Sequence, residues 1–491
     1  MKVHTHQNGG KGENARGLPR EMRHAAISRG YLMLLALVFG AIFFIVFGAL
    51  SSFVLTENRS ESAAASKAKA LGIAEGGLEY YRWFLAHNPG NLQNGTGHAG
   101  PYTASYADPE GGNMGTYTLS ISGNQSCGQT TSIDITSTGK PSDNLGVSAT
   151  LIARYAQPTV AQYAYILNDS VWAGSDRVIY GPYHSNGGIR MDGTANAPVT
   201  SSLSNWTCTS SFGCNSNTTE PGVFGAGPNQ SLWSYPTPQT DFSAIAANFS
   251  SLKSSAQTSG IYLPRYSSGN SNNASYWRGY HLIFNSNGTV TVNRVTSTTQ
   301  LNVTPVNSAD PTTDNTLINT ESFYATYALP ANCGLIYVED NTWVEGVVPG
   351  KVTLVVANVV TAGVSPNAML TDNITYANAS SGLTLIAEND VLITPDSPMN
   401  MSLNGIFIAQ NGAFGRNYYG CNNAYEPRTA LTIHGTTVSN KRTGTKWLNG
   451  CNPDAGYQTR TDAFDRTLST DPPPFTPNTS TDYVFVDWKQ K

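Results

Sequence analysis

The chain has 491 residues, with 28 Lys and Arg against 32 Asp and Glu, a formal net charge of −4. At about 100–200 residues per domain this length allows two to four domains, and the charge balance excludes a general nucleic-acid binder, which needs a basic surface. Only 12% of residues are charged and 47 are Gly, which favours an extracellular β-structure over a cytosolic helical enzyme. An apolar content of 40% excludes wholesale disorder.

An apolar run lies near the N-terminus, from Gly30 to Leu55, without a charged side chain. About 20 helical residues cross a bilayer core, so the run predicts a transmembrane helix over 30–56. A cleaved signal peptide is the main alternative, but its apolar region is shorter, about 7–15 residues. The preceding leader, residues 1–29, is basic. By the positive-inside rule the N-terminus is cytoplasmic, the protein is a single-pass protein of the cytoplasmic membrane, and the main domain is exported.

The helical pattern continues beyond the membrane, over 57–88. Apolar or small residues recur at helical spacing, at Ala64, Leu71, Ala74, Leu78, Tyr81 and Leu85. Asn88-Pro89-Gly90 is a stop signal, so we expect one helix from about Gly30 to His87. Gly76-Gly77 marks either close packing or a kink.

The segment from Ser28 to Trp83 resembles the N-terminal region of type IV pilus biogenesis proteins of the PilX type. The residues that carry the likeness are Arg29-Gly30 before the apolar run and the Ala74-Glu75 pair in the Ala-rich helix. The resemblance implies cleavage after Gly30 by a prepilin peptidase, which would leave Tyr31 as the new N-terminus, and contacts with other pilin subunits. Most major pilins have Glu at the fifth mature position, where this chain has Leu35. That difference favours a minor or tip subunit, or an uncleaved membrane anchor.

The fold class expected for the whole chain is mainly β with one long N-terminal helix. Residues 100–157 contain three alternating strands, at Thr116–Ile121, Ser132–Thr136 and Val147–Tyr155, and predict a small antiparallel β-domain like a pilin head.

Residues 164–300 predict a β-rich domain with one helix and one hairpin. Thr240 is the expected cap of a helix with Phe242, Ile245, Phe249 and Leu252 on one face. Tyr280–Phe284 and Thr289–Val295 form the expected hairpin.

Residues 330–491 predict a β-helix or solenoid-like domain with a C-terminal tail. Apolar strands begin at Leu335, Lys351, Leu383, Gly405 and Ala430, with Asn and Gly between them. The chain lacks a strict repeat motif, so a β-sandwich with long loops remains an alternative.

The six cysteines are Cys127, Cys208, Cys214, Cys333, Cys421 and Cys451. An exported domain permits disulfides. The pairs nearest in sequence are Cys208 with Cys214 and Cys421 with Cys451, and these are the disulfide candidates. No CxxC motif is present, so we expect no metal site.

Catalytic motifs of the common hydrolases, metalloproteases and nucleotide-binding enzymes are absent from the sequence. A Gly-rich cluster holds His184, Ser185, Asn186 and Asp192, in which His184 as base and Asp192 as its orienting partner is the catalytic interpretation. The structural interpretation, turn and ladder hydrogen bonds, is favoured. We therefore expect no catalytic residues and no cofactor.

Three kinds of site are considered for the exported part. A membrane-anchored carbohydrate-active β-helix enzyme would need paired carboxylates in one cleft, and the candidates are Asp192, Glu339, Asp340, Glu345, Glu388 and Asp390. A loop calcium site would use Asp310, Asp314 and Asn315. For adhesion, aromatic side chains would stack on a surface or carbohydrate ligand, and the tryptophans that suit this are Trp172, Trp206, Trp233, Trp277, Trp343 and Trp447.

The first hypothesis is a non-enzymatic, pilin-like cell-surface protein, anchored in the membrane or built into a type IV pilus, that displays a large β-domain for adhesion or assembly. The enzyme is the alternative. A third interpretation is an envelope protein unrelated to pili. Expected partners are membrane lipid, pilin subunits and a prepilin peptidase, with no nucleic acid.

Overall fold

The computed structural model describes residues 29–491 except 89, 269–273 and 449. The predicted cytoplasmic leader therefore lies outside the described residues, apart from Arg29. The fold is mainly β with one long N-terminal helix, as the sequence predicted. The chain divides into two compact units, Met1–Ala68 and Lys69–Lys491.

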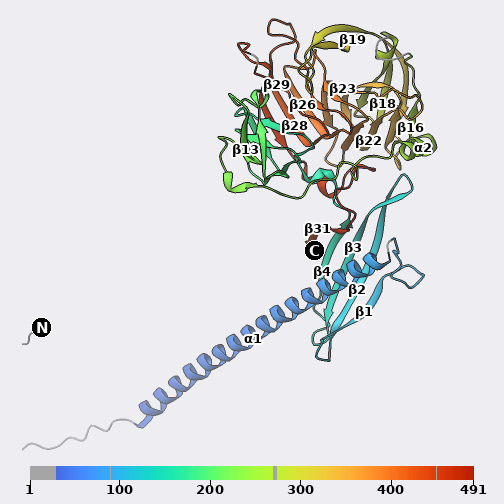
Figure 1. The fold of residues 1–491 in the computed structure, drawn as a ribbon. Coiled ribbons are helices and arrows are strands. Elements are labelled where there is room, and N and C mark those ends of the chain that lie inside the picture. Colours follow the sequence, from blue (N-terminus) through green and yellow to red (C-terminus); the bar gives the residue numbers. More distant parts are fainter. Residues whose placement is uncertain (1–28, 89, 269–273, 449) are drawn as a thin grey trace, which may run out of the picture. The chain divides into compact units, whose positions relative to one another are not determined.

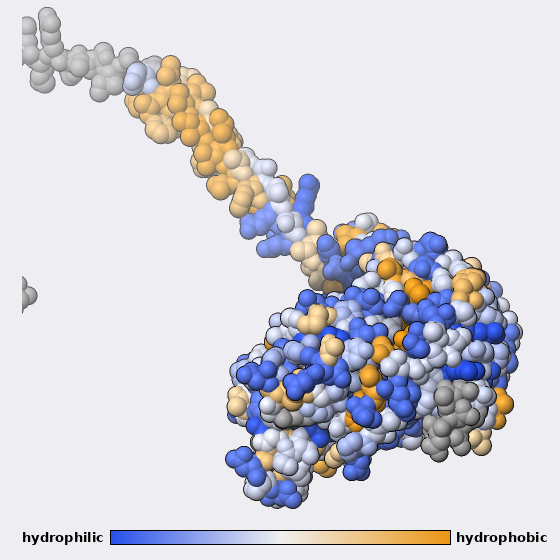
Figure 2. Space-filling view, turned by 90° about the horizontal axis from the view of Figure 1, so that it is seen from above, coloured by the Kyte–Doolittle hydropathy of each residue, from blue (hydrophilic) through white to orange (hydrophobic). Residues whose placement is uncertain are grey.

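Helix α1 spans Arg29–His87, close to the predicted bounds. In the first unit the side chains of its apolar run are exposed, and Figure 2 shows the N-terminal stretch of the helix covered by hydrophobic side chains, followed by a more hydrophilic stretch. Among the described residues it is the one helix long and apolar enough to cross a membrane, and none of its most apolar window is buried in the protein. An apolar surface of this extent is unfavourable in water and favourable in lipid.

In the second unit, the end of α1 packs against an antiparallel sheet to form a small domain, here called the head. Its consecutive strands are β1 (Tyr102–Ala107), β2 (Asn113–Ser126), β3 (Gln129–Pro141) and β4 (Ala149–Ala156). The helix contributes the predicted stripe of Ala74, Leu78, Tyr81 and Leu85, although Ala64 is exposed.

The two adjacent glycines of α1 allow the close approach of helix and sheet. A Cβ at Gly76 would lie 2.3 Å from the ring of Tyr106, and one at Gly77 would lie 2.4 Å from Ser137 Oγ. Gly76-Gly77 thus marks close packing, one of the two roles expected for it, within one uninterrupted helix.

A fifth strand completes the head sheet from the far end of the chain. Strand β31 (Val484–Gln490) pairs antiparallel with β4, from Val484 opposite Ala156 to Gln490 opposite Leu151. Everything between β4 and β31 is therefore inserted into the head. The structure differs here from the predicted C-terminal tail of 330–491, because the last strand belongs to the head sheet.

The inserted part winds as a solenoid whose strands pair in parallel (Figure 1). The first stack follows the predicted strand series, in the order β16 (Ile261–Leu263), β20 (Leu335–Val338), β22 (Lys351–Val356), β24 (Gly382–Ala387), β26 (Asn400–Ala409) and β28 (Arg428–Ser439). It then continues into strands from much earlier in the chain, namely β5 (Tyr165–Leu167), β8 (Tyr183–Ser185), β11 (Val199–Ser201) and β15 (Trp233–Ser234). Parallel stacking of successive coils is the pattern of a solenoid and not of a β-sandwich.

Further stacks form the other sides of the coil. One contains β17 (Gly279–Asn285), β21 (Asn341–Val348), β23 (Ala368–Tyr376), β25 (Val391–Ile393) and β27 (Phe414–Gly415). Another runs from β26 and β28 to β30 (Ala455–Ala463), β7 (Arg177–Tyr180) and β10 (Thr194–Ala195). A short one contains β6 (Val171–Ala173), β9 (Ile189–Met191) and β14 (Val223–Phe224). Leu, Ile and Val side chains fill the interior.

The remaining elements lie outside these stacks of strands. They are the pair β12 (Asn205–Cys208) and β13 (Thr218–Pro221), the long strands β18 (Thr289–Val303) and β19 (Thr312–Ala328), the short strand β29 (Lys446–Trp447), and helices α2 (Phe249–Ser259) and α3 (Arg466–Thr470). Single 3-10 turns lie at Val160–Gln162, Ser210–Phe212, Gln230–Leu232 and Ala274–Trp277. The predicted hairpin is confirmed as the antiparallel pair β17 and β18.

Two predictions about residues 164–491 differ from the structure. Helix α2 begins after Asn248, whose side chain accepts a hydrogen bond from Ser251 N, and not after Thr240. Asp241 instead accepts hydrogen bonds from Ser243 N and Ala244 N, which closes a separate turn. The predicted domains 164–300 and 330–491 share their stacks of strands and form one solenoid.

Candidate functional site

A cavity lies where late coils of the solenoid stack on early ones, a junction here called the seam. Its volume is about 470 Å³, within the range of about 300–1,000 Å³ typical of small-molecule sites. Most of the lining comes from three segments, 169–177, 304–309 and 442–448. The stacking of β28 on β5 and of β30 on β7 brings the first and third of these together.

Trp172 forms one aromatic part of the lining. Its indole N–H donates to Asp192 Oδ2 at 2.8 Å, and the same oxygen accepts Arg190 Nε at 2.8 Å. The Arg190 guanidinium lies 4.4 Å from the centre of the Trp172 ring. A Cβ at Gly213 would lie 2.4 Å from the ring, so the indole is held on several sides.

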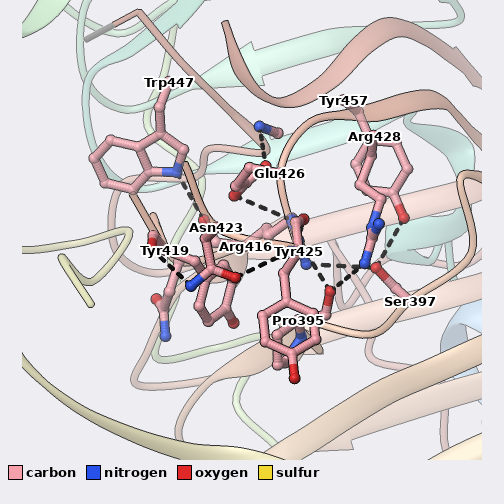
Figure 3. Close-up of polar contacts among 12 residues, drawn as sticks. Pro395, Ser397, Arg416, Tyr419, Asn423, Tyr425, Glu426, Arg428, Trp447 and Tyr457 are labelled. Carbon is pink, nitrogen blue, oxygen red and sulfur yellow. Dashed lines mark hydrogen bonds and ion pairs between the residues drawn. The ribbon is translucent and has the colours of Figure 1, made fainter. Parts of the chain in front are cut away.

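Trp447 forms the second aromatic part. Its indole N–H donates to the backbone oxygen of Arg416 at 3.0 Å (Figure 3). Arg416 is fully buried, and its guanidinium donates to the backbone oxygens of Thr394 at 2.5 Å and Tyr425 at 2.7 Å. The indole of Trp447 is thus held by the backbone of a residue whose own side chain is buried and hydrogen-bonded.

The charged groups of the cavity are arranged in pairs. Arg460 donates two hydrogen bonds to Asp176, at 2.8 and 3.0 Å, and Lys446 lies 3.9 Å from Asp176 and 3.4 Å from Asp454. Arg177, nearly fully buried, is 2.6 Å from Asp462.

Asp176 and another residue of the lining, Arg442, have pKa values shifted by their surroundings. Burial alone would raise the pKa of Asp176, but the hydrogen bonds from Arg460 outweigh it and the pKa is lowered. Burial lowers the pKa of the Arg442 guanidinium, and the charge of Asp169 partly offsets this effect. Asp176 is therefore ionised at neutral pH and is unsuited to act as a general acid. The arrangement offers aromatic surface and paired polar groups, which suit binding.

The Gly-rich cluster predicted from the sequence divides between two hydrogen-bond networks. His184 is buried, with Nδ1 2.9 Å from Thr200 Oγ1 and Nε2 3.1 Å from Asn186 Oδ1, and burial lowers its pKa. Ser185 Oγ donates to the backbone oxygen of Asp169 at 2.8 Å. Asp192 belongs to the other network and holds Trp172. No hydrogen bond between His184 and Asp192 is found in the described part of the chain.

The carboxylates considered for glycosidic chemistry hold structural contacts. Glu339 binds Lys253 Nζ at 2.6 Å and the Tyr262 hydroxyl at 2.7 Å. Asp340, Glu388 and Asp390 accept backbone N–H groups, and Glu345 accepts the Thr371 hydroxyl at 2.9 Å. None of the six lines the seam cavity.

The calcium loop considered from the sequence is not a cluster of free ligands. Asp314 is buried and accepts hydrogen bonds from Asn417 Nδ2 and the Tyr419 hydroxyl. Among the residues that the structure describes, no group of three or more His, Cys, Asp or Glu has the geometry of a metal site.

All six cysteines form disulfides. The structure joins Cys208 to Cys214 and Cys421 to Cys451, the two candidate pairs. It also joins Cys127, at the turn between β2 and β3, to Cys333, just before β20. This third bond ties the head to the solenoid, and nothing in the local spacing of cysteines pointed to it.

The residues considered for processing lie at the start of α1. Gly30 and Tyr31 are helical, and Tyr31 and Leu35 are 70% and 41% exposed. An apolar side chain thus occupies the position where the resemblance to pilins would place a carboxylate.

Both tryptophans of the cavity were among the six that the sequence suggested for adhesion. The charged groups of the cavity were not predicted. Asp176, Arg442, Lys446 and Arg460 carry no motif. Their proximity depends on the order in which coils stack. A signal that would have found them is a pairing of early with late strands, which one sequence does not reveal.

The comparisons with known proteins give little further guidance. No family model matches the chain, and no curated protein matches it. Among solved structures, the competence-associated pilin ComZ from Thermus thermophilus matches with 12% identity and a TM-score of 0.31, over 87% of this chain and 97% of ComZ. A likeness this weak carries no conclusion about fold or function, and the proposals below rest on the residues themselves.

Proposed function

We propose that the chain is a non-enzymatic, pilin-like cell-surface protein, anchored in the cytoplasmic membrane or built into a type IV pilus as a minor or tip subunit. One observation carries this proposal: α1 is a single helix with two environments. Its N-terminal part is apolar and exposed, while its C-terminal part is a core element of an antiparallel β-domain. A helix that both enters lipid and completes a head is what the resemblance to PilX-type proteins implies.

Leu35 favours a minor or tip position over a main subunit. If the chain is cleaved after Gly30, Tyr31 carries a free α-amino group next to lipid-facing side chains. An unpaired charge in lipid costs several kcal/mol, on the order of 2.5–3.5 even on insertion scales. Leu35 supplies no carboxylate to neutralise the amine of a neighbouring subunit. Long homopolymers are therefore disfavoured, whereas a subunit at the tip only presents its helix to the subunits beneath it.

The inserted solenoid is the displayed part, for adhesion or for assembly with other envelope proteins. Its disulfides suit an oxidising compartment. The alternative, a carbohydrate-active enzyme, requires two carboxylates free to exchange protons with a substrate. The candidates that the sequence offered are engaged by internal donors, as described above.

Surface labelling of intact cells tests the display. A membrane-impermeant amine reagent applied before lysis should modify lysines of the exported unit, such as Lys140 and Lys441, which are both exposed. An abundant cytoplasmic protein serves as the control for leakage. Labelling that appears only after lysis contradicts the proposal.

A further inference from the structure

We propose that the seam cavity binds a neutral oligosaccharide, with sugar rings stacked on Trp172 and Trp447 and hydroxyl groups bonded to the polar lining. This inference rests on the proposed surface display, since it gives the displayed domain a ligand. The cavity is separate from the helix that anchors the chain, and its binding activity is measurable without cells.

The two indoles line the cavity, and the N–H group of each is already satisfied inside the protein. Each N–H donates inside the protein, to Asp192 from Trp172 and to the backbone of Arg416 from Trp447. Both rings line the cavity and remain partly exposed. Sugar rings have apolar C–H faces that pack on aromatic surfaces, and a ring fixed before binding loses little entropy when it is covered.

The polar lining matches hydroxyl groups, which both donate and accept hydrogen bonds. Arg442 and Lys446 supply donors, Asp169 supplies an acceptor, and Ser211 and Asn307 supply groups of mixed character. A cavity of about 470 Å³ has room for a mono- or disaccharide portion of a longer chain.

The balance of charge selects a neutral ligand. Arg460 is paired with Asp176, Arg177 with Asp462, and Lys446 lies between Asp176 and Asp454. The fourth base, Arg442, donates to the backbone oxygen of Ser211 at 2.5 Å, and the exposed Asp169 lies in the same lining. The lining therefore holds four bases and two acids, Asp169 and Asp176. Two more carboxylates, Asp454 and Asp462, lie outside the lining and pair with Lys446 and Arg177. Because the four positive charges have four carboxylates close by, a polyanion such as a nucleic acid or sulfated glycan gains little net attraction. Asp169, which is exposed, would also repel it.

The experiment is glycan-array binding by the full chain in lipid nanodiscs, with neutral, uronate-containing, sialylated and sulfated oligosaccharides as separate sets. We expect binding within the neutral set. Ala309→Trp places a large ring in the cavity at an exposed loop position, and it should abolish binding. Ala379→Trp makes the same change at an exposed loop position outside the cavity and should leave binding unchanged. Trp447→Ala should weaken binding at least tenfold.

Several results would overturn the proposal. They are no binding to any set, binding confined to acidic glycans, or binding that survives Ala309→Trp at the wild-type level. Far-ultraviolet circular dichroism of each variant shows whether the fold is retained, so the Ala309→Trp result stands even if Trp447→Ala unfolds the seam. Failure on the array leaves the surface-labelling result intact, and failure of labelling leaves binding in nanodiscs intact, so the two proposals fail separately.

Discussion

Thr437 pairs directly with Tyr165 in parallel register, although the two residues lie near opposite ends of the inserted domain's sequence. The chain enters the solenoid at the seam and leaves it there. Val160 N donates to Pro477 O at 3.0 Å, and Thr159 forms an antiparallel β-bridge with Asn478. Because entry and exit are adjacent, a whole solenoid fits between two strands of the head without separating β4 from β31.

The seam depends on a buried charge pair. Arg177 from β7 and Asp462 from β30 are 4% and 2% exposed and lie 2.6 Å apart, and the Tyr165 hydroxyl also donates to Asp462. Asp462→Asn leaves the guanidinium buried without its carboxylate and should lower the free energy of unfolding by about 3–5 kcal/mol. Denaturant unfolding measures this change.

The matched control is Asp482→Asn, at an exposed aspartate. It should change the unfolding free energy by no more than about 0.5 kcal/mol. Equal effects of the two substitutions would mean that the pair does not hold the seam.

The disulfides should differ in their contributions to stability. Cys127 and Cys333 are 206 residues apart, while Cys208 and Cys214 are six apart. In the chain-entropy model the long loop contributes about 5 kcal/mol and the short one about 2 kcal/mol. Unfolding of the two double Cys→Ser variants compares them, and a larger loss from the short loop would contradict this ranking. Mass mapping of non-reduced peptides checks the pairing itself.

His281 of β17, which faces Glu321 of β19 and Glu345 of β21, should make the free energy of unfolding depend on pH. Its Nδ1 lies 2.9 Å from Glu321 and its Nε2 3.7 Å from Glu345. Burial alone would lower the pKa of His281, but the neighbouring carboxylates of Glu345 and Glu321, which favour the protonated imidazole, outweigh burial and raise the pKa above its usual value of 6.5. A raised folded-state pKa gives stability that is fully present below pH of about 6.5 and is lost as pH rises through the folded-state value.

His281→Gln should therefore cost more stability at pH 5.5 than at pH 8.5. Burial lowers the pKa of His184, which gives a dependence of opposite sign, so the quantity to compare is variant minus wild type at each pH. A loss that is equal at both values would show that the charge on His281 does not contribute.

Membrane insertion should fail when charge is placed in the apolar run. Phe43 and Phe44 are 64% and 74% exposed, and each Asp at a helix centre costs about 2.5–3.5 kcal/mol. Replacing both by Asp should release the protein from the membrane fraction or block its export. Leu145→Asp with Phe323→Asp alters two exposed apolar residues of the second unit and should change neither. An unchanged membrane fraction for the first double variant would refute the span.

Local patterns in the sequence predicted the local elements. The helix predicted from about Gly30 to His87 differs from α1 by one residue at its start. The predicted strands at Thr116–Ile121 and Ser132–Thr136 lie inside β2 and β3. The strands predicted to begin at Leu335 and Lys351 are β20 and β22. These elements follow from hydrophobic period and turn residues, which act over a few positions.

Long-range pairings were not predictable in the same way. The bond between Cys127 and Cys333, the pairing of β31 with β4, and the seam each join segments far apart in the chain. Local period carries no information about which strand lies next to which. The cavity was missed for this reason, since Trp172 and Trp447 line the same cavity only after the late coils stack on the early ones.

Mass spectrometry of the N-terminal peptide, on protein sheared from the cell surface, tests the central claim most directly. The proposal predicts a mature chain that begins at Tyr31, present in the filament fraction far below the level of the main subunit. An intact N-terminus with Met1 in the surface form would contradict incorporation into a pilus and leave an uncleaved anchor. This chain as the most abundant filament component would contradict the minor or tip role that Leu35 implies.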